Sequence, residues 1–104
     1  MIDWTRVKGF EWDAGNERKS VEKHGVDQFE AEQVFFSEPL LIAPDPSHSQ
    51  RESRWHALGR TLDGRHLHVT FTLRQDGTLI RVISARPMHR KEKAHYVKAT
   101  QTSP

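Results

Sequence analysis

The sequence contains no cysteine, so disulfide bonds, thiolate nucleophiles and thiolate metal sites are excluded. It also lacks long apolar runs, because charged residues interrupt each hydrophobic stretch of the N-terminal segment MIDWTRVKGFEWD. We therefore expect neither a signal peptide nor a membrane-spanning helix. The absence of cysteine suits a reducing compartment, and the cytoplasm is the expected location.

Apolar residues are scarce as well. They make up 35% of the 104 residues, and the mean hydropathy is -0.78. A chain of this length predicts one domain, residues 1–104, whose small core leaves much of the surface facing water or a partner. The formal net charge is only +2, but 16 Lys and Arg residues and a pI near 9.2 make a polyanion a reasonable ligand class.

The N-terminal third predicts one short strand and two helices. Residues 8–12 alternate loosely between apolar and charged side chains, which favours a strand. Residues 14–24 are rich in helix formers and stop at Gly25, the residue best suited to the left-handed conformation after a helix. Asp27 can cap the second helix, which Pro39 would end.

The remainder predicts strands followed by a helix. A short strand is expected over residues 40–45, followed by an exposed polar loop that extends to residue 53. Pro87 is expected to start a basic terminal helix, and residues 99–104 are expected to fray. Three alternating segments lie between the loop and this helix, separated by two Asp-Gly hairpin signals, at residues 54–61, 65–74 and 78–86.

These elements predict an α+β fold in which an N-terminal strand and two helices pack on a three- to four-stranded antiparallel sheet, with a C-terminal helix. Alternation divides the central strand into two faces. The face expected to pack on the helices carries Leu67, Val69, Phe71 and Leu73. The opposite face is polar and cationic, with His66, His68, Thr70, Thr72 and Arg74.

Three arginines lie at or near the ends of the last two strands: Arg74, Arg81 and Arg86. Guanidinium groups match phosphate oxygens and can stabilise the extra negative charge of a pentacoordinate phosphorus. The alternative is a solvated, charged sheet edge that discourages aggregation. Arg81 and Arg86 differ by an odd number of residues, so only a bulge or a strand end between them would bring them to one face.

The histidines allow two further hypotheses. His24 ends the first predicted helix, where it can transfer a proton during catalysis or simply pack the corner and interact with the helix dipole. His66 and His68 form an H-x-H pair that could share a metal ion with His56 on a neighbouring strand. No Cys or Glu-rich partner is visible for a further metal ligand, so a cationic surface or RNA contact is favoured for this pair.

Several segments, in order along most of the chain, resemble the BrnT family of type II toxins. They are FEWD at residues 10–13, KHGV at 23–26, FEAEQVF at 29–35, and the closing IRVISAR at 80–86 with the following EKAHY. RWHALGRTLDGRHLHVTFT, from Arg54 to Thr72, fits the family's central pattern. Each piece alone is weak, but together their order and spacing are specific.

The resemblance implies a RelE-like α+β ribonuclease that needs no metal or other cofactor. It implies an enzyme that cleaves RNA by attack of the RNA's own 2'-hydroxyl and so inhibits translation. The implied partner is a BrnA antitoxin whose ribbon-helix-helix domain would carry the complex to its promoter DNA. The alternatives are a noncatalytic module that only binds nucleic acid or antitoxin, and, ranked last, a metal-dependent hydrolase built on the three histidines.

The resemblance also implies roles for particular residues. Arg81 and Arg86 would stabilise phosphate and the transition state, Arg74 would position the substrate, and His24 would transfer a proton. The RNA backbone would contact Lys19, Lys23 and Arg65. The chain departs from the family pattern at Phe71, where tyrosine is usual, and at Pro87, where a small residue is common, so proton transfer by a tyrosine at position 71 is not expected.

Overall fold

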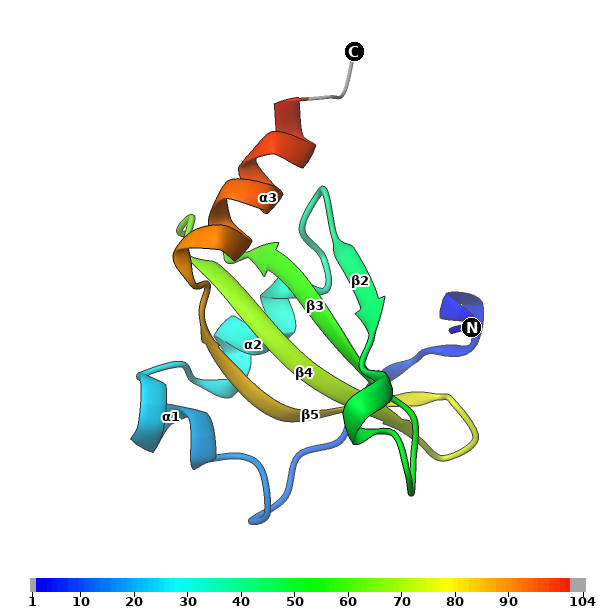
Figure 1. Ribbon diagram of the computed structural model, residues 1–104. Helices are drawn as coiled ribbons and strands as arrows, with labels where there is room; N and C mark the ends of the chain where they lie inside the picture. Colours follow the sequence, from blue (N-terminus) through cyan, green and yellow to red (C-terminus); the bar gives the residue numbers. More distant parts are fainter. Residues whose placement is uncertain (1, 102–104) are drawn as a thin grey trace.

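The computed structural model describes residues 2–101, which form one five-stranded sheet with helices on both sides and at its end (Figure 1). The strand order is β1-β5-β4-β3-β2. In chain order the elements are η1 (Trp4–Arg6), β1 (Gly9–Phe10), α1 (Lys19–His24), α2 (Gln28–Val34), β2 (Leu41–Pro44), η2 (Pro46–His48), β3 (Arg54–Arg60), β4 (His66–Arg74), β5 (Leu79–Pro87) and α3 (Arg90–Gln101).

The α+β class is confirmed, but the expected three- to four-stranded antiparallel sheet is only partly right. Four strands, β2 to β5, pair antiparallel, and β1 adds a fifth that runs parallel to β5. The backbone nitrogen of Lys8 donates to the Thr78 carbonyl, just before β5, and that of Glu11 donates to the Ile80 carbonyl in β5, both at 2.8 Å. The N-terminal strand therefore extends the sheet, where a layer packed against it was expected.

The pairing of β5 with β4 contains one irregularity. Thr70 faces Ser84 while Phe71 faces Val82, so Ile83 has no partner in the register. This β-bulge shifts the alternation of β5 by one residue. Arg81 and Arg86 consequently share a face although their spacing is odd, as the sequence analysis required.

The core lies between the sheet and α2, which Figure 1 shows behind the strands. Ala31 and Val34 of α2 are fully buried against the apolar face of β4. Asp27 caps this helix as expected: its carboxylate accepts from the backbone nitrogen of Glu30, whose side chain accepts in turn from Asp27. The opposite face of the sheet is left to polar side chains.

Four expected helix boundaries are wrong. α2 ends at Val34, several residues before Pro39, which was expected to end it. α1 is shorter than the predicted span of residues 14–24 and begins at Lys19, although it ends at Gly25 in the left-handed conformation as expected. Pro87 closes β5, where it pairs with Leu67, and α3 begins only at Arg90. α3 also continues to Gln101, into the segment expected to fray, while the rest of that segment, residues 102–104, lies outside the described residues.

α3 packs at one end of the sheet through Tyr96. This side chain is fully buried, its hydroxyl donates to the carbonyl of Pro39 at 2.6 Å, and its ring meets His66 edge to face. Glu92, one turn earlier, is thereby held beside the polar face of β4. Within residues 2–101, no helix combines the length and apolar character needed to cross a bilayer.

Gly59 tests the packing of α2 on β3. A Cβ at this position would collide with the hydroxyl of Ser37 and lie only 2.8 Å from Val34 Cγ1 and 2.9 Å from the Val34 carbonyl oxygen. We expect Gly59→Ala to lower the free energy of unfolding by about 2 kcal/mol or more, measured by urea denaturation. Gly9→Ala is the control, because its Cβ would meet Leu79 at an ordinary 3.6 Å. Equal stabilities of the two variants would contradict this packing.

Candidate active site on the polar sheet face

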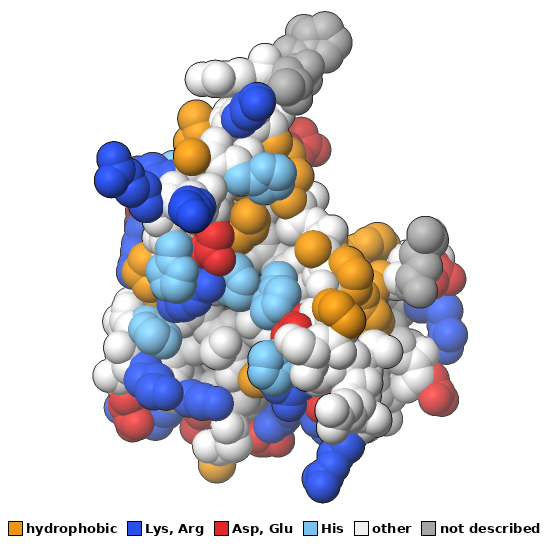
Figure 2. Space-filling model, viewed as in Figure 1, with side chains coloured by type: hydrophobic (Ala, Val, Ile, Leu, Met, Phe, Trp, Pro, Cys, Tyr) orange, Lys and Arg blue, Asp and Glu red, His pale blue; other side chains and the backbone are white. Residues whose placement is uncertain are grey.

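The face of the sheet turned away from α2 carries most of the chemistry-bearing side chains. Figure 2 shows histidines gathered over β3 and β4 in the middle of this face, with Lys and Arg side chains around them. The loop from Asp45 to Ser53, which includes η2, folds over the same face. The expected polar, cationic face is therefore present, and the loop makes it concave.

A cavity of about 290 Å³ lies between this loop, the sheet and the start of α1. Its chemistry comes from cations, imidazoles and hydroxyl groups. The residues that line it are Lys19, Asp45, Ser47, His48, Arg54, His56, Thr70, Ile83 and Ser84.

The carboxylate of Asp45 organises one wall of the cavity. It lies 3.0 Å from Nδ1 of His48 and 3.2 Å from Nε2 of His56, and it accepts a 2.9 Å hydrogen bond from Ser47. Burial alone would raise the pKa of Asp45, but the hydrogen bonds from Ser47 and His48 and the charges of both histidines outweigh it, so the pKa is lowered. Asp45 is thus an anion that orients two imidazoles.

His68 connects this wall to α3. Its ring lies 4.7 Å from that of His56, and its Nε2 is 3.9 Å from the carboxylate of Glu92. Burial, followed by the charge of Arg86, lowers the pKa of His68 to about 4. Because it is neutral near pH 7, His68 is not an ion-pair partner of Glu92 at that pH. The pKa of Glu92 is lowered to about 2, chiefly by hydrogen bonds from Arg86 at 2.8 and 2.9 Å.

Two cations of the cavity have no counterion. Among the described residues, the side chains of Arg54 and Lys19 make neither a hydrogen bond nor an ion pair, although Arg54 Nε is buried. A buried donor without a partner is costly, and an anionic ligand would satisfy it. The cavity therefore favours an anion such as phosphate.

Arg81, predicted to stabilise phosphate, and Arg74, predicted to position the substrate, lie next to the cavity in an ion-pair network. Thr72 of β4 pairs with Arg54 on one side and with Arg81 on the other. Arg81 contacts Glu11 and Asp13 at 2.9 Å, and Arg74 contacts Glu52 at 3.1 Å and Glu11 at 4.0 Å. The hydrogen bonds between Asp13 and Arg81 lower the pKa of the carboxyl and raise that of the guanidinium. Two guanidinium groups here face three carboxylates.

The other predicted residues fall into two places. Arg86 faces the polar side of β5 opposite His68, so it adjoins the cavity, with Glu92 as its counterion. His24 and Lys23 are exposed at the end of α1. Arg65 holds the corner after α1, donating to the Gly25 carbonyl at 3.1 Å and to Glu30 at 2.7 Å. Among residues 2–101, no hydrogen bond or ion pair joins His24 to Arg74, Arg81 or Arg86.

The three histidines of the metal hypothesis do not converge. His56 and His68 are in contact, but the ring of His66 packs against Tyr96. Within residues 2–101, no group of three or more His, Asp or Glu side chains is arranged to hold a metal ion. The geometry thus gives no support to a site built on His56, His66 and His68.

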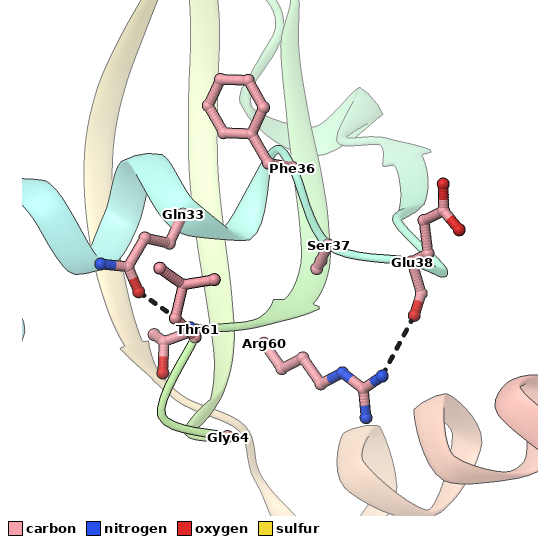
Figure 3. A pocket seen from close by; sticks show the side chains of 8 residues that line it. Gln33, Phe36, Ser37, Glu38, Arg60, Thr61 and Gly64 are labelled. Carbon is pink, nitrogen blue, oxygen red and sulfur yellow. Dashed lines mark hydrogen bonds between the residues drawn. The ribbon is translucent and has the colours of Figure 1, made fainter.

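A larger hollow, about 590 Å³, lies beside the C-terminal end of α2 (Figure 3). Its wall is fixed by a hydrogen bond from the backbone nitrogen of Leu62 to the side chain of Gln33 at 2.9 Å, and Arg60 donates to the Glu38 carbonyl at 3.5 Å. No histidine lines it. This hollow is the larger of the two, but the smaller cavity contains the histidines and the cations without counterions. We therefore assign the candidate site to the smaller cavity.

Asp45, His48 and Arg54 were not among the residues predicted from the sequence. Asp45 and His48 lie in a loop that was interpreted as exposed, and Arg54 starts a predicted strand. Asp45 is in fact only 6% exposed. The sequence feature that could have indicated this arrangement is the segment DPSHS, in which His48 follows Asp45 by three residues after a turn-forming Asp-Pro. That spacing brings the two side chains together in a single turn.

A family model described as "Ribonuclease toxin, BrnT, of type II toxin-antitoxin system" matches residues 12–92. This span includes every lining residue of the cavity. No curated protein matches the chain.

The depressed pKa of His68 predicts acid sensitivity. Its pKa is about 4 in the folded state against 6.5 ordinarily, so the unfolded chain binds an extra proton between these values. The free energy of unfolding should therefore fall by about 2 kcal/mol between about pH 7 and pH 5. His68→Leu should remove this slope in urea denaturation, whereas His24→Leu, at an exposed site, should retain it. An unchanged slope in His68→Leu would contradict the prediction.

Proposed function

Because this chain belongs to the family of BrnT ribonuclease toxins of type II toxin-antitoxin systems, we propose that it is a metal-independent endoribonuclease. It cleaves RNA in the cytoplasm and thereby inhibits translation. Its activity is held in check by an antitoxin, which we propose to be of the BrnA type with a ribbon-helix-helix domain. The complex would bind promoter DNA through that domain.

One observation carries the proposal for the site: Arg54 and Lys19 line the cavity, and neither has a counterion within residues 2–101. Arg74, Arg81 and Arg86, by contrast, each form ion pairs with carboxylates. A phosphate entering the cavity would gain charge-assisted hydrogen bonds without displacing a carboxylate. At the network of Arg74 and Arg81 it would instead compete with three carboxylates.

The chemistry proposed for this cavity is cleavage by the RNA's own 2'-hydroxyl. Its main requirements are alignment of that hydroxyl with the phosphorus and stabilisation of the additional charge on the phosphate oxygens. The guanidinium of Arg54 and the ammonium of Lys19 supply the positive charge. Thr70 and Ser84 offer hydroxyl groups on the floor formed by β4 and β5.

Roles along the path of the RNA are also proposed for the residues predicted from the sequence. The proposed role of His24 changes from proton transfer to contact with the RNA backbone, because it is exposed at the end of α1. Arg86, beside the cavity, is the strongest candidate for a second phosphate contact, and it would exchange Glu92 for the substrate. Arg81, in the same cross-strand row as Arg54, is proposed to stabilise phosphate, and Arg74 is proposed to position the substrate beside it. Contact with the RNA backbone at the α1 side is proposed for His24, Lys23 and Arg65, alongside Lys19.

The antitoxin is proposed to cover the polar sheet face. Its surface against Arg54 and Lys19 should be acidic, because burying two unpaired cations is unfavourable unless the partner supplies opposite charge. A complex that leaves this face open and is nevertheless inactive would contradict the proposal. Binding to a complementary acidic surface would also weaken at high salt.

Replacing Arg54 tests the proposed anion site. We expect Arg54→Gln to lower kcat/KM for RNA cleavage in EDTA by roughly 10- to 100-fold, since one charge-assisted contact to phosphate is lost. Arg6→Gln, which removes one positive charge at the exposed N-terminal end, should stay close to wild type. RNA bound but left intact by the folded wild-type protein would favour the noncatalytic alternative.

Arg86 and Arg81 should respond differently to the same substitution. Arg86→Gln is expected to reduce cleavage, because Arg86 adjoins the cavity. Arg81→Gln is expected to reduce stability first, because it leaves Asp13 without its ion-pair partner and Glu11 with only the 4.0 Å contact to Arg74. Urea denaturation and cleavage kinetics on each variant separate the two effects. Full activity of Arg86→Gln would remove it from the proposed site.

A further inference from the structure

We propose that His48 is the general base of the cleavage reaction and that Asp45 is its positioning residue. This assignment rests on the proposed ribonuclease function and deepens it. It is carried by the geometry of one short loop over the cavity, at residues that the sequence analysis did not single out.

The two nitrogens of His48 have different surroundings. Nδ1 faces the Asp45 carboxylate, at 3.3 Å from Oδ1 and 3.0 Å from Oδ2. An ionised carboxylate only accepts hydrogen bonds, so Nδ1 carries the hydrogen and the lone pair of neutral His48 lies on Nε2. Among residues 2–101, no side chain or backbone group contacts Nε2 by a hydrogen bond or ion pair. With 67% of its side chain exposed, His48 can present this lone pair to a substrate.

His56 uses the same carboxylate but is engaged on both sides. Its Nε2 lies 3.2 Å from Asp45, and its Nδ1 lies 3.1 Å from the hydroxyl of Thr70. Neither nitrogen can approach a substrate without breaking one of these contacts. His56 therefore helps to fix the position of the Asp45 carboxylate, and His48 is the imidazole with a nitrogen available to the substrate.

The loop holds this arrangement through its own hydrogen bonds. The backbone nitrogen of Asp45 donates to the Arg54 carbonyl at 2.9 Å, and the hydroxyl of Ser49 donates to the Asp45 carbonyl at 2.6 Å. The Ser49 oxygen also accepts from the Arg54 nitrogen at 3.0 Å. The same set of hydrogen bonds, at the junction of the loop with β3, therefore holds both the segment that carries His48 and the backbone of Arg54.

His48 and Arg54 also line a second hollow, about 450 Å³, which adjoins the first. The two side chains thus stand where the hollows meet. A chain of nucleotides lying across both would bring a phosphate to Arg54 and the neighbouring 2'-hydroxyl to His48. This position suits an endonuclease, because the substrate can leave on either side.

The proposed reaction needs no cofactor. His48 Nε2 takes the proton of the 2'-hydroxyl as the bond from the 2'-oxygen to phosphorus forms. The bond from phosphorus to the 5'-oxygen breaks, and the leaving oxygen takes a proton from solvent water. The products are a 2',3'-cyclic phosphate and a 5'-hydroxyl, and His48 then returns its proton to solvent.

The test compares full-length variants on purified RNA and on mRNA bound to translating ribosomes, both in EDTA. In His48→Asn, the side-chain amide can still donate to Asp45, but the basic Nε2 is gone. We expect kcat to fall at least roughly 100-fold with stability unchanged. His95→Asn, at an exposed histidine of α3, is the matched control and should keep wild-type activity. Cleavage by His48→Ala should be partly restored by added imidazole.

Asp45→Asn tests the positioning role. It should lower kcat while leaving KM close to wild type, because Asp45 orients the base and does not contact RNA. Activity of His48→Asn within about threefold of wild type would overturn the assignment while leaving the ribonuclease proposal intact. Failure of imidazole to restore any cleavage by folded His48→Ala would also count against it. No cleavage by wild-type protein on either RNA would overturn both proposals.

Discussion

The one-residue shift in the β4–β5 pair is the constraint on which the two faces of this molecule depend. In a regular strand, Arg81 and Arg86 would lie on opposite faces, whereas Val82 and Ser84 would lie on the same face. With Ile83 as the extra residue, Val82 and Ala85 both enter the core, and Ser84 and Arg86 join the polar face. The sheet can thus pack α2 on one side and build a reactive surface on the other.

Charge compensation divides that reactive surface. At the β1 end, Glu11, Asp13 and Glu52 surround Arg74 and Arg81, so positive charge there stabilises the attachment of the N-terminal segment. On the β3 and α1 sides of the same face, neither Arg54 nor Lys19 has an ion-pair partner among the described residues, although Glu52 lines a hollow together with Arg54. The single carboxylate of the cavity, Asp45, is occupied by two imidazoles instead. The arginines of this face therefore differ mainly in whether a carboxylate is their ion-pair partner.

Much of the fold followed from local patterns. Alternation and two Asp-Gly turns predicted the three long strands, and Gly25 and Asp27 predicted the corner before α2. The parallel pairing of β1 was missed because two residues carry no pairing signal of their own. The site was harder to predict, since the burial of Asp45 depends on how its loop folds back onto β3, which is a tertiary contact. The resemblance indicated the chemistry but not which cations remain unpaired.

The buried carboxylate explains why a loop, and not the sheet, can hold the reactive imidazole accurately. Asp45 is 6% exposed, and leaving its carboxylate without hydrogen-bond donors would be unfavourable. Ser47, His48 and His56 each satisfy part of that requirement, so the conformation that stabilises the anion is also the conformation that orients His48. Any rearrangement of the loop that released His48 would remove a hydrogen bond from a buried charge. Stability and reactive geometry are therefore coupled through one side chain.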